Sequence, residues 1–144
     1  MTQLRSIAPN FSIAAQIDPQ ELRALAAAGF RSIISNRPDN EEPRQPDWAE
    51  IAAAAAAAGM EARHIPVRPG AIADADVTRF SAALEGMPGP ILAFCRSGTR
   101  AASLWGLSQM GKLRADEIIG AAAAAGCDLS SLQERIERGG GAKK

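Results

Sequence analysis

Residues 89–105, GPILAFCRSGTRAASLW, determine both the expected fold and the expected functional site of this chain. The segment PILAF (90–94) is apolar throughout, as is typical of a short strand covered on both faces of a sheet. The residues after Gly98 read as a helix, so CRSGTR (95–100) connects a strand to a helix. This stretch therefore predicts one strand–loop–helix unit of a parallel sheet, with a thiol where the strand ends.

The rest of the chain repeats the same alternation. Apolar, β-branched stretches predict further strands at 11–17, 30–36 and 61–67, and helical patterns with terminal glycines predict helices at 19–29, 48–59 and 74–86. Three closing helices are expected at 100–111, 114–126 and 128–138. We therefore expect an α/β fold with a mostly parallel central sheet of about four to five strands and helices on both faces. Residues 1–138 would form a single domain, followed by a disordered tail at 139–144.

Composition excludes several broad functions. Lys plus Arg and Asp plus Glu both number 16, so net charge does not favour bulk attraction to nucleic acid or to a membrane. No apolar run reaches the roughly 18–20 residues that span a bilayer, and the first residues do not resemble a secretory signal. Two cysteines do not make a disulfide framework. We expect a cytoplasmic protein with free thiols.

The loop after the 91–94 strand combines a nucleophile with an anion-binding arrangement. In open α/β sheets, sites form beyond the carboxyl ends of the strands, which is where Cys95 lies. The dipole of the following helix, backbone amides curled around Gly98 and the guanidinium of Arg100 would all favour a thiolate. The same groups would hold a tetrahedral oxyanion. We therefore predict Cys95 as the nucleophile, Arg100 as its catalytic partner, and an anion site made by Arg96, Ser97, Gly98, Thr99 and Arg100. The alternative is that Cys95 is only a small buried apolar residue.

Acidic residues after the strands are candidates for a general acid. Asp39 follows the 30–36 strand and lies at the same edge of the sheet as Cys95, so it is the first candidate. Asp74 and Asp76 are further candidates. The structural alternatives are a turn residue for Asp39 and a helix cap for Asp74.

Two arginines also follow strands. Arg37 and Arg68 would complete a basic pocket around the anion, or would instead pair with Glu41 or Glu42 at the surface. His64, the only histidine, lies inside a predicted strand and is expected to be packed or exposed rather than a base. Cys127 follows a glycine between helices and is expected to be structural rather than a resolving thiol. Two distant cysteines and one histidine predict no metal site, and no cofactor is expected.

Four segments carry a family resemblance: FCRSGTR (94–100), GFRSIISNRPDNEEPRQPDW (29–48), HIPVRPGAI (64–72) and EIIGAAAAAGCDL (117–129). Together they resemble the bacterial phosphatase-like domain that is also found in beta-lactamase hydrolase-like proteins, over about residues 4–137. The resemblance implies the fold of dual-specificity protein tyrosine phosphatases. Some members carry a metallo-beta-lactamase-like domain in the same chain, which implies a functional link to such a protein. Other members have been named sulfurtransferases.

Residue counts leave the reaction open. The phosphatases of this superfamily place five residues between cysteine and arginine, whereas here there are four, as in many rhodaneses, which carry sulfur as a cysteine persulfide. Arg68, Pro69 and Gly70 stand where the phosphatase acid is expected, and Ala101 replaces the hydroxyl residue that often follows the arginine. These departures favour sulfane-sulfur transfer through a Cys95 persulfide. The alternatives are phosphomonoester hydrolysis through a phosphocysteine and a non-catalytic anion-binding module. In each case the partner is a small anion.

Overall fold

A five-stranded sheet in the order β1-β2-β5-β3-β4 forms the centre of the molecule. The structure is a computed structural model and describes residues 2–141. The strands are β1 (Leu4–Ala8), β2 (Phe11–Ala14), β3 (Ser32–Ser35), β4 (Glu61–His64) and β5 (Ile91–Phe94). β1 pairs with β2 in antiparallel fashion, and the other neighbouring strands are parallel. The expected α/β fold with a mostly parallel sheet is therefore confirmed.

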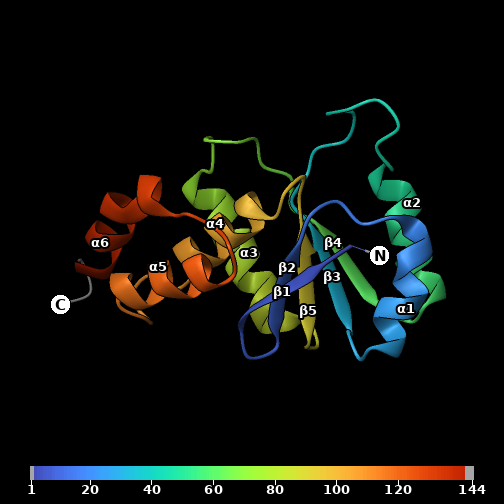
Figure 1. Cartoon of the computed structure of the whole chain (residues 1–144), viewed down its shortest axis with the longest axis horizontal. Helices are drawn as coiled ribbons and strands as arrows, with labels where there is room; N and C mark the ends of the chain where they lie inside the picture. Colours follow the sequence, from blue (N-terminus) through green and yellow to red (C-terminus); the bar gives the residue numbers. More distant parts are fainter. Residues whose placement is uncertain (1, 142–144) are drawn as a thin grey trace.

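Helices cover both faces of this sheet (Figure 1). α1 (Leu22–Ala27), which follows a 3₁₀ turn at Pro19–Glu21, and α2 (Trp48–Ala57) lie on one side. On the other side lie α3 (Asp74–Gly86), α4 (Thr99–Ser108), α5 (Ala115–Ala124) and, after a 3₁₀ turn at Ser130–Leu132, α6 (Gln133–Gly141). α6 includes 139–141, which we had expected in the tail, and 142–144 lie outside the described residues. None of the helices in the described range is long and apolar enough to cross a membrane.

The side chains of β5 show how the sheet directs the thiol. Ile91 and Ala93 pack into the cluster shared with α3 and α4, whereas Leu92 and Phe94 pack into the cluster shared with α1 and α2. Successive residues of a strand point to opposite faces. By this alternation Cys95, the next residue, is directed to the face that α4 covers. The apolar run seen in the sequence therefore both buries the strand and aims its terminal thiol at the start of α4.

β1 was not predicted from the sequence. Its residues are mostly half-buried at the edge of the sheet, so the alternation of apolar and polar side chains is weak. It joins β2 through Pro9 and Asn10, and Asn10 has a φ of 65°. A Pro-Asn pair suits the central positions of a type II turn, whose second central residue needs a positive φ, so Pro9 and Asn10 are a turn signal in the sequence.

Candidate active site

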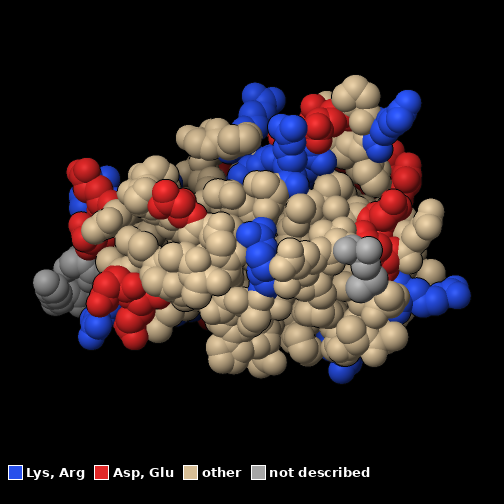
Figure 2. Space-filling view, in the orientation of Figure 1, with Lys and Arg blue, Asp and Glu red and all other residues tan. Residues whose placement is uncertain are grey.

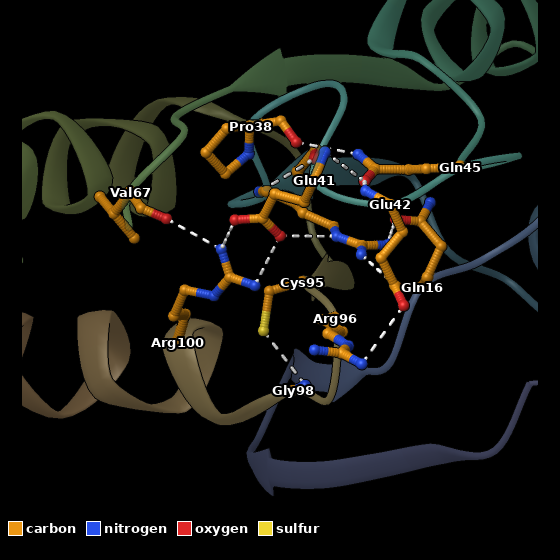
Figure 3. Close-up of polar contacts among 12 residues, drawn as sticks. Gln16, Pro38, Glu41, Glu42, Gln45, Val67, Cys95, Arg96, Gly98 and Arg100 are labelled. Carbon is orange, nitrogen blue, oxygen red and sulfur yellow. Dashed lines mark hydrogen bonds and ion pairs between the residues drawn. The ribbon is translucent and has the colours of Figure 1, made fainter. Parts of the chain in front are cut away.

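The loop after β5 folds around the thiol of Cys95 (Figure 3). Cys95 is fully buried, and the backbone N–H of Gly98 donates to its Sγ at 3.1 Å. Gly98 has a φ of 98°, a conformation that favours glycine, and it immediately precedes α4. The thiol consequently lies at the positive end of the α4 dipole, where a negative charge is stabilised.

Other amides of this loop are available to a ligand. Within residues 2–141, the backbone N–H groups of Arg96, Ser97, Thr99 and Arg100 donate to no backbone or side-chain acceptor. The residues Arg96, Ser97 and Thr99 are exposed, whereas Arg100 is buried, so this loop runs from the surface into the molecule. Unpaired donors that surround a thiol at the start of a helix form a seat for an oxyanion.

Arg100 is held beside this seat by the loop that follows β3. Its side chain is only 9% exposed. Nη1 donates to Glu41 Oε2 at 2.8 Å and to the carbonyl of Val67 at 3.0 Å, and Nη2 donates to Glu41 Oε1 at 2.9 Å. A guanidinium has five N–H donors, so the Nε–H and the second Nη2–H remain along one edge. That edge can hold two oxygens of a tetrahedral anion.

The charge of Arg100 is secured by its neighbours. Burial alone would lower the pKa of Arg100, but the hydrogen bond to Glu41 and the negative charge of a Cys95 thiolate raise it. The hydrogen bond from Arg100, aided by Arg37, lowers the pKa of Glu41 from 4.5 to about 2. At neutral pH Glu41 is therefore a carboxylate that orients Arg100 and is not a proton donor.

Arg37 completes this network from the buried side. Its side chain is almost fully buried and donates to Glu41 at 2.8 Å, to Gln16 at 3.0 Å and to Glu42. Glu42 also pairs with Arg96 at 3.2 Å. Of the two roles considered for Arg37 in the sequence, the structure therefore shows pairing with both glutamates, although at a buried rather than a surface position. The contact of Glu41 with Arg100 was not predicted.

The lowered pKa of Glu41 makes the stability of the fold depend on pH. A carboxyl whose pKa falls on folding stabilises the protein above its ordinary pKa of 4.5, and this contribution disappears as the pH falls towards about 2. We expect wild type to be more stable than Glu41→Gln by a constant amount above about pH 5. The difference should shrink progressively below that pH. Urea unfolding of both proteins at several pH values checks this, and a difference that does not change with pH would contradict it.

The candidate acids lie apart from the thiol. Asp39 Oδ1 accepts a hydrogen bond from the backbone N–H of Trp48 at 2.8 Å, in the first turn of α2. Asp76 accepts from the N–H of Ala73 at 2.8 Å, before α3. Asp74 pairs with Arg135 at 2.9 Å. Among the described residues, none of these three carboxylates bonds to Cys95 or Arg100.

Arg68, His64 and Cys127, the other residues considered from the sequence, each have a different environment in the structure. Arg68 is exposed and forms no ion pair within the described range. His64 Nε2 lies 2.8 Å from the carbonyl oxygen of Arg37, and its ring stacks on Trp48 with centroids 5.0 Å apart. Cys127 is buried, and burial raises the pKa of its thiol. No group of three or more potential metal ligands occurs in the part of the chain that the structure describes.

Arg5 of β1 is a contact of the loop that sequence reasoning missed. Nη2 donates to the carbonyl of Ser97 at 2.8 Å, and Nη1 donates to the carbonyl of Ala125 at 3.0 Å. A Cβ at position 98 would collide with Nη2 of Arg5, so the contact between Arg5 and the loop also favours a glycine at this position. Arg5 thereby fixes one carbonyl of the loop to a side chain of β1. The turn signal at Pro9 and Asn10 indicated that the chain reverses before β2.

A cavity of about 380 Å³ opens beside the Cys95 loop. Its walls come from the loop, from the segment after β4, from α4, from the 3₁₀ turn before α6 and from α6 itself, namely Pro69, Gly70, Ile72, Arg96, Ser97, Thr99, Arg100, Ser103, Ser131, Leu132 and Arg135. Figure 2 shows Lys and Arg side chains gathered over the ends of the parallel strands, at the top of the view. The volume suits a small organic anion.

Comparison with known proteins gives this site a context. Residues 3–112 match the family described as the phosphatase-like domain of the beta-lactamase hydrolase-like protein. The beta-lactamase hydrolase-like protein of Xylella fastidiosa (strain 9a5c) is 38% identical over 129 residues. That alignment covers 88% of this chain and 30% of the relative, so the chain spans about a third of the length of the curated relatives that it matches.

Solved structures support the same assignment. The crystal structure of a "putative phosphatase" from Neisseria meningitidis is 35% identical, covers 94% of this chain and 96% of its own, and superposes with a TM-score of 0.84. The active form of Tk-PTP is 16% identical over 98% of this chain and 97% of its own, with a TM-score of 0.70. The expected protein tyrosine phosphatase-like fold is thus confirmed.

Proposed function

The chain belongs to the family of phosphatase-like domains of beta-lactamase hydrolase-like proteins, and we propose that it hydrolyses phosphomonoesters through a phosphocysteine at Cys95. One observation carries this proposal: the buried thiol of Cys95 accepts a hydrogen bond from the loop that begins α4, and Arg96, Ser97, Thr99 and Arg100 of the same loop line a cavity. A nucleophile and an oxyanion seat at one point are what attack on a phosphate ester requires. The names of the relatives point to the same chemistry.

Each step of the reaction can be assigned to groups of the site. The Cys95 thiolate attacks phosphorus, an S–P bond forms, and the P–O bond to the alcohol breaks. The loop amides and the free edge of Arg100 bind the non-bridging oxygens as their charge develops. Water then attacks phosphorus, the S–P bond breaks, and inorganic phosphate leaves as the thiolate is restored. The departing alkoxide or phenoxide takes a proton from solvent or from an acid.

The surroundings of the leaving group suggest which esters react fastest. Asp39, the first candidate for the acid, is bound to the backbone of α2, and Glu41 is ionised at neutral pH. Because neither of these two carboxyls in the described part of the chain is assigned as a proton donor, esters whose leaving group needs no proton have the advantage. We therefore propose aryl phosphates with acidic phenols as the best substrates.

Sulfane-sulfur transfer is the second candidate, because only four residues separate Cys95 from Arg100. In this reaction the thiolate attacks the outer sulfur of thiosulfate, an S–S bond forms, and sulfite departs with the electron pair of the broken bond. Sulfite is a stable anion and needs no proton. The persulfide then passes its terminal sulfur to an acceptor thiol. The residue count favours this reaction, whereas the names of the phosphatase relatives favour hydrolysis.

Intact mass separates the two reactions. We expect the protein to release phosphate from 4-nitrophenyl phosphate and, when quenched during turnover, to carry one added phosphoryl group. Incubation with thiosulfate should leave its mass unchanged. A gain of one sulfur atom, with no phosphate release, would instead establish sulfur transfer. Neither adduct and no turnover would indicate an anion-binding module.

A further inference from the structure

Arg135 brings a positive charge to the cavity from a distant part of the chain. It lies in α6, beyond residues 3–112 that match the family, and its side chain is 29% exposed. Nη1 donates to the carbonyl of Ile72 at 2.8 Å, and Nη2 donates to Asp74 Oδ1 at 2.9 Å. These contacts hold the guanidinium at the wall of the cavity that also contains the Cys95 loop.

The cavity lining has an unbalanced charge. It includes Arg96, Arg100 and Arg135 and no aspartate or glutamate. Arg96 and Arg100 are paired with glutamates of the loop after β3. Arg135 pairs with Asp74, whose side chain is 98% exposed. An ion pair with so exposed a partner is weak, so an anion in the cavity can replace Asp74 at low cost.

Apolar side chains complete the same cavity. Pro69, Ile72 and Leu132 supply apolar wall, together with the hydroxyl groups of Ser103 and Ser131. A ligand that reaches both the Cys95 loop and Arg135 would therefore have an anion at each end and an apolar body between them. A single aromatic ring suits the volume of about 380 Å³.

We propose that the preferred substrates are aryl phosphomonoesters that carry a second anionic group, and that Arg135 selects them by binding this group. The inference rests on the proposed function for the position of the phosphate. The second anion takes the place of Asp74 on Nη2, while the carbonyl of Ile72 keeps the guanidinium in position through Nη1. Arg135 is thus a specificity residue and takes no part in the reaction at phosphorus.

Binding of two matched phosphonates tests this without turnover. (4-Carboxybenzyl)phosphonate and (4-carbamoylbenzyl)phosphonate have nearly the same shape, and only the first has a second anion. We expect calorimetric titration of wild type to give a Kd about tenfold lower for the carboxylate, as suits a charge-assisted hydrogen bond. Arg135→Gln should bring the two Kd values close together and leave that of the carboxamide unchanged. Arg138→Gln, an exposed arginine of the same helix that does not line the cavity, should keep the preference.

Asp74→Asn distinguishes ligand binding from a purely structural role. Both this variant and Arg135→Gln break the ion pair between α6 and the start of α3. If Arg135 binds the second anion, Asp74→Asn removes its competitor and should strengthen the preference for the carboxylate. If Arg135 only anchors the segment before α3, both variants should weaken the two ligands alike, which would overturn the proposal. So would equal Kd values in wild type. Loss of hydrolysis alone would count against the proposed function and would leave this measurement valid.

Discussion

Cys95→Ser is expected to abolish phosphate release from aryl phosphates, with a fall in kcat on the order of 10⁴-fold or more. A hydroxyl is far less acidic than a thiol, so the dipole of α4 and the Gly98 amide cannot supply a comparable nucleophile at neutral pH. Serine fits the volume of the thiol, and the fold should remain intact. Release of inorganic phosphate, measured alongside the thermal unfolding temperature, checks both expectations.

The other cysteine provides a matched control. Cys127 is also buried and packs into the cluster on the α4 side of the sheet, but we assign it no chemical role. Cys127→Ser should therefore keep most of the activity, despite some loss of stability from the buried hydroxyl. Equal loss of turnover in both variants would mean that packing, and not the Cys95 nucleophile, accounts for the effect. Full activity in Cys95→Ser would refute the phosphocysteine.

Arg100→Lys is expected to lower kcat by about 10²–10³-fold, the usual effect of removing one donor to a developing oxyanion. Lysine keeps the charge but cannot bond to Glu41 along one edge and to a phosphate along another. The ammonium should remain near Glu41, so the loss should fall on turnover more than on stability. Steady-state kinetics with 4-nitrophenyl phosphate measures this loss.

A second bidentate arginine serves as the control for this substitution. Arg114 forms a two-bond fork with Asp116 at 3.0 and 2.9 Å, but both side chains are exposed and lie outside the cavity. Arg114→Lys should leave kcat unchanged. If Arg100→Lys were as active as Arg114→Lys, the guanidinium would be a structural partner of Glu41 and the oxyanion would be bound by the loop amides alone.

The sequence revealed the centre of the site better than its surroundings. The apolar run before Cys95 and the glycine after it predicted a strand, a tight loop and a helix, because these patterns are local. The contacts of Glu41 with Arg100 and of Arg5 with Ser97 join residues 59 and 92 positions apart. Periodicity shows which face of an element is buried, but it does not show which loop side chains meet across the fold. Such pairs become visible only when the loops are placed in space.

Secondary structure was also predicted unevenly, for a physical reason. β5 is an apolar run that is buried throughout, and β3 is also buried and has two β-branched isoleucines at its centre, so both strands were clear in the sequence. β1 lies at the edge of the sheet and is only half-buried, so its sequence combines polar and apolar residues without a clear strand pattern. Because β1 was not recognised, Arg5 could not be placed near the loop. The omission of one edge strand therefore also concealed a side chain that contacts the candidate active site.

The cavity beside the Cys95 loop draws its walls from three stretches that are far apart along the chain, namely 69–72, 96–103 and 131–135. Arg100 and its neighbours in the Cys95 loop form one part of the wall, whereas Ser131, Leu132 and Arg135 form another. In the proposed enzyme, the residues that react with the substrate and those that select it therefore lie in different parts of the sequence, so each set can change in evolution without the other. Mutations in the C-terminal helices can reshape what the cavity accepts while the nucleophile and its hydrogen bonds stay unaltered. In the proposed enzyme, we therefore expect residues 131–135 to influence substrate selection, and exchange of this segment with that of a relative should change the selectivity.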